Sequence, residues 1–341
     1  MAARVGQRLD DLLGAEQRRW AALNEDLNAP FEGLRSLIGQ GGKRLRPGFL
    51  YWGFVGAGGD PQSTVPVDAG AAVELLHAFA LFHDDVMDGS VTRRGSRTTH
   101  LLFADRHERD GWVGESRRFG EGVAILVGDL AFVYADMLVD GAPPEAMAIW
   151  HELRIELNVG QYLDILGTAS GERRLDRAEQ ISRFKSAKYT VERPLQMGAL
   201  LAAPDRSADL MPALSRYGLA LGDAFQLRDD VLGAFGDERV TGKPVGDDLI
   251  EGKPTPLLSL ATAAANSSQQ ALLSGVGKTV GPEDVAGIQQ VLIDTGALRM
   301  IEDRITALTN EAIEAITAAP ICTDACQALS DLAIYLADRD G

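Results

Sequence analysis

The sequence predicts an all-α protein. Apolar residues recur at spacings of three and four over most of the 341 residues, which is the period of a helix with one buried face. The residues between them are mostly good helix formers such as Ala, Leu, Glu and Arg. Alternating runs of β-branched residues, which are typical of half-buried strands, are nearly absent. We therefore expect helices to account for almost the whole chain.

Ten segments show the helical period clearly. In chain order they are 5–25, 66–88, 121–139, 144–166, 177–202, 210–235, 255–275, 283–294, 298–316 and 323–338. Polar or Gly- and Pro-rich stretches separate them and predict connectors at 53–65, 103–119, 167–176, 203–209 and 236–254. Because no internal repeat or linker composition interrupts this series, we expect a single domain over residues 1–341.

The composition of the chain indicates which partners are not expected for the protein and in which compartment we expect it. The net charge of -16 makes binding to nucleic acid or to an anionic membrane surface unexpected, since a polyanion would be repelled. The N-terminal segment has acidic residues in every apolar run, unlike a signal peptide. No stretch is expected to span a membrane. We therefore expect a cytoplasmic protein, and the only two cysteines, Cys322 and Cys326, fit a reducing compartment.

The strongly apolar segment 71–90 carries a polar stripe. At helical spacing, His77, Asp84 and Asp88 fall on one side of it. Asp84 and Asp88 stand one turn apart with Asp85 beside them, so these carboxylates repel one another. A divalent cation removes the conflict, because Mg²⁺ commonly takes one or two carboxylates together with waters and substrate phosphates. The alternative is a solvated acidic helix end.

A second acidic stripe lies in the segment 218–237. It places Asp223, Gln226, Asp229 and Asp230 on one side of another largely apolar helix. Two such stripes could face each other across a helical bundle.

Short basic motifs accompany the two acidic stripes. They are Lys43, Arg44 and Arg46 in GGKRLRP, Arg93 and Arg94 in TRRG, Lys185 and Lys188 in KSAKYT, and Lys243 and Lys253. In an acidic protein these clusters are candidate phosphate ligands, although each cation alone could simply be solvated. Nucleotide phosphate loops are excluded because Lys243 is followed by Pro244, which breaks the GxxxxGK[ST] pattern. Metals and cations together indicate diphosphate substrates.

Several motifs occur in the same order as in a known family. They are GGKRLRP, HDDVMDGSVTRRG, Gly128-Asp129, GQYLD, KSAKYT, FQLRDD and the GK loops, and they span nearly the whole chain. This set resembles the trans-prenyltransferase (polyprenyl diphosphate synthase) family. The resemblance implies an isoprenoid synthase type helical bundle around a deep central cavity, assembled as a homodimer. It also implies that isopentenyl diphosphate is condensed with dimethylallyl, geranyl or farnesyl diphosphate.

The resemblance also implies a role for each matching residue. The ligands of about three Mg²⁺ on the allylic diphosphate would be Asp84, Asp85, Asp88 and Asp229. The other residues near this diphosphate would be Asp230, Arg93, Lys185, Lys243 and Lys253. Those in the isopentenyl diphosphate pocket would be Lys43, Arg46, His77 and Arg94. We further expect Gln226, Ser186 and Tyr189 to line the path of the carbocation.

Two positions depart from the family pattern. Gly233 stands where many relatives have a third aspartate, and Asp237 lies too far along the chain to replace it. Because Asp229 is the expected metal ligand, we expect activity to survive this change. Ser186 replaces a threonine that is frequent in relatives, and it keeps the hydroxyl group.

The residues before the first acidic motif predict the product length. Phe79 and Ala80 precede Asp84 by five and four positions, an aromatic beside a small residue. This pair resembles geranylgeranyl-type relatives, so we predict a C20 product, with farnesyl diphosphate (C15) as the alternative. A class I terpene cyclase would not be expected to carry GGKRLRP. A silent partner subunit would be expected to lack site residues that are present here.

Overall fold

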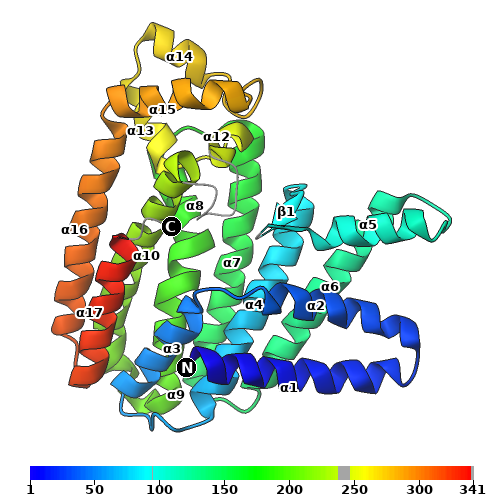
Figure 1. Ribbon diagram of the computed structural model, residues 1–341. Coiled ribbons are helices and arrows are strands. Elements are labelled where there is room, and N and C mark those ends of the chain that lie inside the picture. The colour runs from blue at the N-terminus through cyan, green and yellow to red at the C-terminus, as the bar shows by residue number, and fades with distance from the viewer. Residues whose placement is uncertain (94, 237–245, 339–341) are drawn as a thin grey trace. The chain divides into compact units, whose positions relative to one another are not determined.

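The computed structural model describes residues 1–93, 95–236 and 246–338, which are almost entirely helical (Figure 1). This confirms the all-α prediction. Backbone contacts divide the chain into two compact units. Unit 1 comprises Met1–Tyr51 and Asp60–Pro143, and unit 2 comprises Trp52–Gly59 and Pro144–Gly341. That the whole chain acts as a single domain stays a prediction.

Unit 1 is a group of helices around one buried helix, α4. Its elements are α1 (Ala2–Ala21), η1 (Glu25–Leu27), α2 (Asn28–Gly39), the first part of α3 (Leu45–Gly56), α4 (Val65–Met87), β1 (Thr92–Arg93), β2 (Ser96–Arg97), α5 (Thr99–Arg109) and α6 (Ser116–Val139). α4 packs against α1, α2, α5 and α6. It is apolar on nearly every side, and such a helix is stable only when it is surrounded.

A short hairpin follows α4. β1 and β2 pair in antiparallel fashion, with Thr92 opposite Arg97 and Arg93 opposite Ser96. The Thr98 hydroxyl donates a hydrogen bond of 2.8 Å to the Ser90 carbonyl, which ties the two ends of the hairpin together. The hairpin therefore holds Arg93 just beyond the C-terminal end of α4.

Unit 2 is a larger bundle centred on α10. Its elements are the end of α3, α7 (Pro144–Ser170), α8 (Leu175–Ser182), the π-helix η2 (Arg183–Glu192), α9 (Arg193–Ala202), η3 (Pro204–Arg206), α10 (Ser207–Phe235), α12 (Asp247–Glu251), α13 (Pro256–Ala264), α14 (Ser267–Leu273), η4 (Pro282–Asp284), α15 (Val285–Asp294), α16 (Ala297–Thr317) and α17 (Thr323–Ala337). α10 packs against η2, α9, α16 and α17 (Figure 1).

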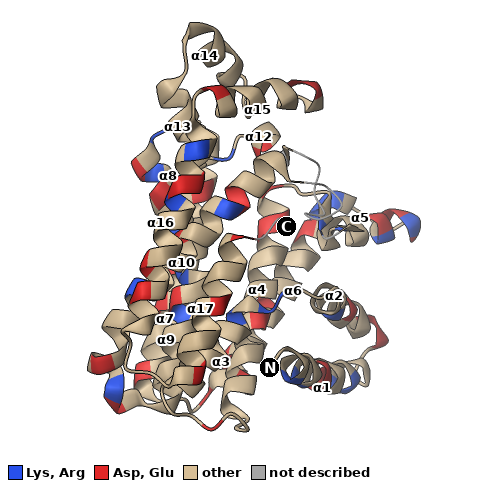
Figure 2. Cartoon of the chain, turned by 60° about the vertical axis from the view of Figure 1, so that its left-hand side comes forward, with Lys and Arg blue, Asp and Glu red and all other residues tan. Residues whose placement is uncertain are grey.

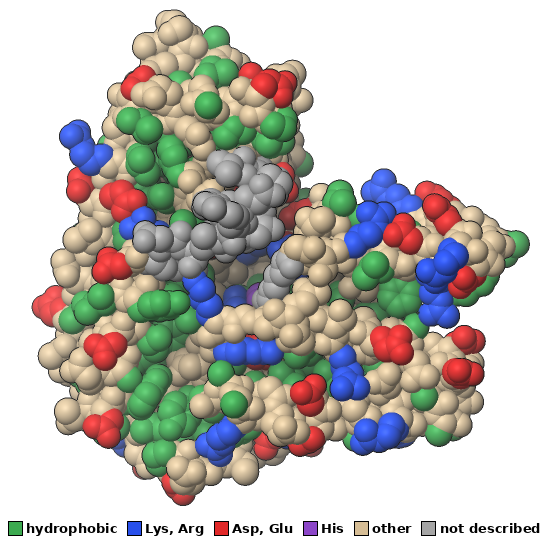
Figure 3. All heavy atoms as spheres, in the orientation of Figure 1, with side chains coloured by type: hydrophobic (Ala, Val, Ile, Leu, Met, Phe, Trp, Pro, Cys, Tyr) green, Lys and Arg blue, Asp and Glu red, His purple; other side chains and the backbone are tan. Residues whose placement is uncertain are grey.

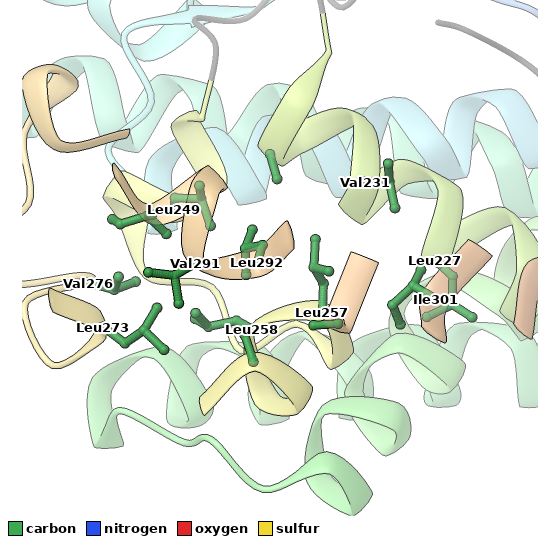
Figure 4. Packing of buried hydrophobic residues seen from close by; sticks show 14 of the residues in the cluster. Leu227, Val231, Leu249, Leu257, Leu258, Leu273, Val276, Val291, Leu292 and Ile301 are labelled. Carbon is green, nitrogen blue, oxygen red and sulfur yellow. The ribbon is translucent and has the colours of Figure 1, made fainter. Parts of the chain in front are cut away.

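A cluster of buried apolar side chains fixes the C-terminal half of α10 (Figure 4). Val231 of α10 shares it with Leu257 of α13, Leu292 of α15 and Ile301 of α16. Leu249 joins the cluster from the short helix α12. Since each such side chain stabilises the fold by about 1.5–3 kcal/mol when buried, α12 is anchored next to α10 despite its five residues.

The structure corrects several predicted boundaries. The helices α2, α3 and α5 were not predicted, and α5 occupies part of the expected connector 103–119. The buried side of α5 includes His100 and His107, so its apolar period is weak. The predicted helix 255–275 is divided between α13 and α14, because Asn266 and Gln269 form a capping box that starts a new helix.

Two described helices, α4 and α6, are long and apolar enough to cross a membrane by length and composition alone. The most apolar window of α4 is 67% buried within the protein, as expected of a core helix. The corresponding window of α6 is 39% buried, so this helix keeps an exposed apolar side. Elsewhere the helices carry charges of both signs (Figure 2), and Arg216 of α10, for example, pairs with Glu311 and Glu314 of α16.

A buried ion-pair network joins α7, η2 and α9 in unit 2. Glu156 is buried and accepts hydrogen bonds from Lys188 and, at 2.7 Å from both Nε and Nη2, from Arg193. Burial opposes the charge of Glu156, but the hydrogen bonds from Arg193 and Lys188 outweigh it and hold the pKa of this carboxyl below its ordinary value. The network is therefore stabilising at neutral pH and weakens in acid.

We expect Glu156→Gln to lower the free energy of unfolding by about 1.5–3 kcal/mol at pH 7, because the negative charge that pairs with Arg193 and Lys188 is removed and the amide nitrogen cannot accept their hydrogen bonds. A lowered native pKa stabilises the fold above the ordinary pKa of glutamate, and this stabilisation is lost as the pH falls through the native value. Urea unfolding at pH 7 and at successively lower pH should show the difference from the unsubstituted protein shrinking. The exposed Glu152→Gln, one turn earlier, is the control. A pH-independent difference would contradict this account.

Candidate active site

The first acidic motif lies at the C-terminal end of α4. Asp84 is half-buried and Asp85 is buried, while Asp88 caps the helix and is exposed. The Asp88 backbone N–H donates to the Asp84 carbonyl at 2.8 Å, so the helical geometry extends through the motif. The structure thus places the three predicted carboxylates within one turn at the end of a buried apolar helix.

Arg93 binds this acidic end directly. Its Nε and Nη2 donate to Asp85 Oδ1 at 2.9 and 2.5 Å, and Nη2 also lies 3.4 Å from Asp84 Oδ2. Burial raises the pKa of Asp85 above its ordinary value, although the charge and hydrogen bonds of Arg93 oppose this. Arg93, predicted to contact a diphosphate, here holds two of the predicted metal ligands in place.

The predicted chain-length residues lie on α4, one and a half turns before the acidic motif. The Phe79 ring centroid is 4.5 Å from that of His83 and 4.8 Å from that of Phe132 on α6. A Cβ atom at Gly128 would lie 2.5 Å from the His83 ring, so only glycine leaves room for this imidazole. The Gly128-Asp129 motif therefore allows the packing beside Phe79. Ala80 is half-buried next to it.

The predicted isopentenyl diphosphate residues Lys43, Arg46 and His77 all belong to unit 1. Lys43 is exposed just before α3, and Arg46 and His77 are half-buried on α3 and α4. Arg94, the fourth predicted residue, lies outside the described residues.

The loop that carries Lys43 is fixed by its neighbour Arg44. Arg44 has a φ of 48°, in a region that L-residues rarely adopt. Its guanidinium forms an ion pair with the buried Glu74 of α4 and donates to the Ile38 carbonyl at 2.9 Å. Arg44, interpreted above as a candidate phosphate ligand, is thus an anchor for the loop. Glu74 stands one turn before His77, so the anchor is on the same helix as another predicted ligand.

The KSAKYT motif lies in the π-helix η2, where a single α-helix was predicted over 177–202. π-helical turns are rare and occur often at functional sites. Small neighbours make room for the wider turn: a Cβ at Gly160 of α7 would lie 2.5 Å from the Lys185 backbone nitrogen, and one at Gly222 of α10 would lie 2.7 Å from the Ala187 Cα. The sequence of α7 and α10 therefore accommodates the π-helix.

The two lysines of this motif have different partners. Lys185 Nζ lies 2.5 Å from Asp164 Oδ2, in the GQYLD motif of α7. Lys188 instead joins the buried Glu156 network. Ser186 is half-buried between them, and Tyr189 is buried. Lys185 is thus positioned by a carboxylate on a neighbouring helix.

The second acidic motif lies near the end of α10. Asp229 is exposed, whereas Asp230 is only 6% exposed. Gln226 Nε2 donates to Asp230 Oδ1 at 2.8 Å, and Asp230 Oδ2 has no hydrogen-bond partner among the described residues. Burial raises the pKa of Asp230 well above its ordinary value, opposed by the Gln226 hydrogen bond, while the charges of Asp248 and Asp229 raise it further.

Lys253 follows α12 and is held by two acidic side chains. Its Nζ lies 3.2 Å from Asp248 Oδ1 and 2.7 Å from Glu251 Oε2. Lys243, the other predicted lysine of this region, lies outside the described residues, as does Asp237.

A preformed metal cage is absent: within 1–93, 95–236 and 246–338, no three His, Cys, Asp or Glu side chains converge closely enough to hold an ion by themselves. Mg²⁺ normally keeps several waters and takes one or two carboxylates together with substrate phosphates. In unit 1, the exposed Asp88 and the half-buried Asp84 offer such carboxylates, and in unit 2 the exposed Asp229 does. Each motif by itself therefore fits a metal that is bound together with a diphosphate.

A cavity of about 450 Å³ lies in unit 1 next to the acidic end of α4. Its walls include Asp85 and Arg93, together with Ser36 of α2, Gln40 just after α2, and Arg106 of α5. Basic side chains of α5 are visible at the right of Figure 3. The volume is within the range of small-molecule sites.

Sequence reasoning missed the partners of the basic residues. Asp164, Glu156 and Glu74 each pair with a cation of a recognised motif. For Asp164 a signal was present, since it closes the GQYLD motif. Glu74 is visible in the sequence as a carboxylate in the apolar segment 71–90, but its pairing with Arg44 is not. Glu156 sits in a helix without any local pattern, so only the packing of the helices identifies it.

Known proteins share this fold and these motifs. A family model described as polyprenyl synthetase matches residues 30–293. A geranylgeranyl diphosphate synthase of Mycobacterium tuberculosis is 37% identical over 239 residues, which are 68% of this chain and 61% of that protein. A geranylfarnesyl diphosphate synthase of Aeropyrum pernix is 30% identical over 315 residues, 89% of this chain and 92% of that protein.

A solved structure shows the likeness in three dimensions. Geranylgeranyl pyrophosphate synthase from Corynebacterium glutamicum, complexed with isoprenyl diphosphate and magnesium, has a TM-score of 0.92 and 38% identity, and the match covers 98% of this chain and 97% of that chain. The fold is thus the all-α isoprenoid synthase fold. The chain belongs to the polyprenyl synthetase family and is a prenyltransferase of the short-chain trans-prenyl diphosphate synthase type. This favours a synthase over the terpene cyclase alternative.

Proposed function

We propose that this chain joins isopentenyl diphosphate to an allylic diphosphate with Mg²⁺ as cofactor, and that geranylgeranyl diphosphate is its main product. The observation on which this proposal rests is the acidic end of α4, where Asp84 and Asp85 are held by Arg93 beside a cavity. Two neighbouring carboxylates, of which Asp85 is buried and adjoins the cavity, are held in one orientation by the arginine and could bind a metal-bridged diphosphate. The magnesium and isoprenyl diphosphate in the Corynebacterium structure support the same substrate class.

The reaction begins when the bond between C1 and the diphosphate oxygen of the allylic substrate breaks, leaving an allylic cation and diphosphate. Arg93, Lys185, Lys253 and Lys243 would bind the diphosphate and stabilise its growing charge. Asp84, Asp85, Asp88 and Asp229 would hold about three Mg²⁺, which supply further positive charge to the leaving oxygens. Asp164 orients Lys185 through their ion pair of 2.5 Å.

The second substrate then supplies the electrons of the new bond. The double bond of isopentenyl diphosphate attacks C1 of the cation, a carbon–carbon bond forms, and a proton leaves to restore a double bond, with the released diphosphate as the proposed acceptor. Lys43, Arg46, His77 and Arg94 would bind the isopentenyl diphosphate through its charged oxygens. Gln226, Ser186 and Tyr189 would line the path of the cation, which must stay away from water.

The test of this function is a product assay with the purified full-length chain. Radiolabelled isopentenyl diphosphate, Mg²⁺ and C5, C10 or C15 allylic starters should yield a labelled C20 diphosphate from each starter. A product that stops at C15 would support the farnesyl alternative. Absence of any transfer with all three starters would contradict the proposed function and favour a silent partner subunit.

Phe79→Ala should lengthen the product beyond that of the unsubstituted enzyme. The Phe79 ring packs between His83 and Phe132, one and a half turns before the acidic motif. Its removal would open space along α4, and each helical turn of about 5.4 Å is close to the length of one isoprene unit. Chromatography of the dephosphorylated products measures this. Phe119→Ala on α6, whose ring packs against Trp112 away from the cavity next to the acidic end of α4, is a control aromatic of unit 1. An unaltered product profile for Phe79→Ala would contradict its role as the floor.

We also propose that the chain forms a homodimer, because two helices expose apolar stripes at helical spacing. In unit 1, α6 exposes Leu126, Val133 and Met137. In unit 2, α7 exposes a second stripe, which comprises Ile155, Val159, Tyr162 and Leu166. Apolar stripes of this kind are unusual on a monomer surface and typical of subunit interfaces. A location in the cytoplasm is part of the same proposal.

A further inference from the structure

The segment that carries Lys253 is held by an arginine that belongs to none of the recognised motifs. Arg173 lies in the connector between α7 and α8. Its Nη1 donates to the Gly252 carbonyl at 3.4 Å and its Nη2 donates to the Val276 carbonyl at 3.3 Å. Nη1 also donates to the carbonyl of Glu172 at 2.8 Å. One guanidinium therefore joins the connector after α7 to the segments that follow α12 and α14.

The backbone of Arg173 is itself fixed by this connector. Gly171 ends α7 with a φ of 66°, and the Glu172 N–H donates to the Gly167 carbonyl at 2.9 Å. Glu172 Oε1 then accepts hydrogen bonds of 2.9 Å from the backbone N–H groups of Arg173 and of Arg174. The guanidinium thus extends from a chain segment whose course is determined by hydrogen bonds on both sides of Glu172.

The two more distant carbonyls belong to segments whose backbones touch. Gly252 has a φ of 75°, and a Cβ atom built on it would lie 2.5 Å from the Gly277 Cα. Only glycine allows the two chains to approach so closely. Arg173 binds the carbonyl of Gly252 on one chain and that of Val276, the residue before Gly277, on the other. The guanidinium therefore holds this backbone contact together.

Lys253 follows Gly252 directly, so its backbone is held on both sides. On the far side, Pro254 packs against α7, where a Cβ atom at Gly167 would lie 3.0 Å from the Pro254 Cγ. The same end of α7 thus supports the residues before and after Lys253, through Arg173 in one case and through Gly167 in the other. A lysine side chain is long and flexible, and a fixed backbone limits where its ammonium group can lie.

The ammonium group of Lys253 lies beside the second acidic motif. Its Nζ is 3.2 Å from Asp248 Oδ1, and the Asp248 carboxylate lies against Gly233 of α10. Position 233 is one turn beyond Asp229. A shift of the Gly252 backbone would therefore move the lysine relative to the end of α10.

We propose that Arg173 is a positioning residue for Lys253: by holding the Gly252 carbonyl, it fixes the direction from which this lysine reaches the allylic diphosphate. The inference rests on the proposed function, in which Lys253 binds that diphosphate. Arg173 itself touches no substrate, so its whole effect on the reaction passes through Lys253. An arginine suits this role because its planar guanidinium presents five N–H donors in a fixed fork, which can bind several carbonyls at once.

A double-mutant cycle tests the proposal. Arg173→Ala should lower kcat/KM for farnesyl diphosphate by about tenfold to a hundredfold, because a displacement of about 1 Å in a positioned group is sufficient for such a loss. The KM for isopentenyl diphosphate should stay unchanged. In a Lys253→Ala background, Arg173→Ala should have less than about a twofold further effect, since the group that it positions is gone. Steady-state kinetics of the full-length protein, below the unfolding transition of each variant, measures all four corners of the cycle.

A merely structural arginine gives a different result. If Arg173 only stabilised the fold, its removal would lower kcat/KM by the same factor with and without Lys253, and this outcome would overturn the proposal. Unchanged kcat/KM in Arg173→Ala would overturn it as well. The matched control is Arg174→Ala, since Arg174 lies in the same connector, is largely exposed and pairs with Glu172 through its side chain. Its kcat/KM should stay within about twofold of that of the unsubstituted protein.

Arg173→Lys separates geometry from charge. It keeps the positive charge but replaces the fork by one ammonium group, so it should recover only a small part of the kcat/KM that Arg173→Ala loses. Full recovery would show that charge alone acts, and would contradict the proposed positioning. If Arg173→Ala does not fold, the same cycle with Arg173→Lys and Lys253→Ala gives the answer.

Failure of this inference and failure of the proposed function are distinguishable. If the function holds but Arg173 has no positioning role, Lys253→Ala is impaired while Arg173→Ala transfers prenyl groups normally. If the function itself is wrong, the unsubstituted protein transfers no prenyl group, and the inference is overturned together with it.

Discussion

Asp84→Ala is expected to reduce kcat by at least about a hundredfold to a thousandfold, the range seen when one group that stabilises transition-state charge is removed. Asp84 lies at the end of α4, half-buried, and shares Arg93 with Asp85. In the proposed mechanism its carboxylate holds a cation on the departing diphosphate. Loss of this ligand should affect the chemical step more than substrate binding. Steady-state kinetics over a range of Mg²⁺ concentrations measures both.

The fold should survive this substitution. Asp84 stands beside two other carboxylates, so removing it relieves repulsion as well as weakening the contact with Arg93. We expect the free energy of unfolding to change by no more than about 1 kcal/mol. Asp68→Ala is the matched control, since Asp68 lies near the opposite end of α4 and also pairs with an arginine, Arg8, at 2.5 Å. Equal kcat values for the two variants would remove Asp84 from the mechanism.

The all-α class was predictable because the apolar spacing of α4, α10 and α16 extends over many residues and can be recognised without knowing how these helices pack. α5 was not predictable in this way, because its buried side is made partly of histidines that hydrogen-bond, such as His107 to the Val113 carbonyl at 3.1 Å. The π-helix η2 was hidden for another reason. Its formation depends on glycines in α7 and α10, and the local sequence of η2 itself contains only helix-compatible residues.

The candidate site was predictable where its residues are adjacent in sequence and not where they come together by packing. Asp84, Asp85 and Arg93 were identified from one motif, and the structure joins them. By contrast, Asp248 approaches Gly233 only because Leu249 is buried in the apolar cluster of unit 2. No spacing rule along the chain contains that information. Ion pairs between helices, such as Lys185 with Asp164, depend in the same way on how the helices pack.

Lys185→Ala is expected to lower kcat by about a hundredfold, because the proposed mechanism uses this cation on the departing diphosphate. Its partner Asp164 would be left buried and unpaired, which costs stability as well. The double variant Lys185→Ala/Asp164→Ala should regain stability but not kcat. This separates the structural from the catalytic consequence of the substitution.

Lys188→Ala provides the comparison within the same π-helix. Lys188 pairs with Glu156, which keeps its two hydrogen bonds from Arg193 in the variant. We therefore expect Lys188→Ala to lower the free energy of unfolding while kcat, measured below the unfolding transition, stays within about threefold of the unsubstituted enzyme. If both lysine variants lost kcat equally, the effect would come from distortion of η2, and Lys185 would have no direct role on the diphosphate. A selective loss in Lys185→Ala requires that the charge itself acts on the substrate, since the two side chains share one segment and differ mainly in where their ammonium groups are held.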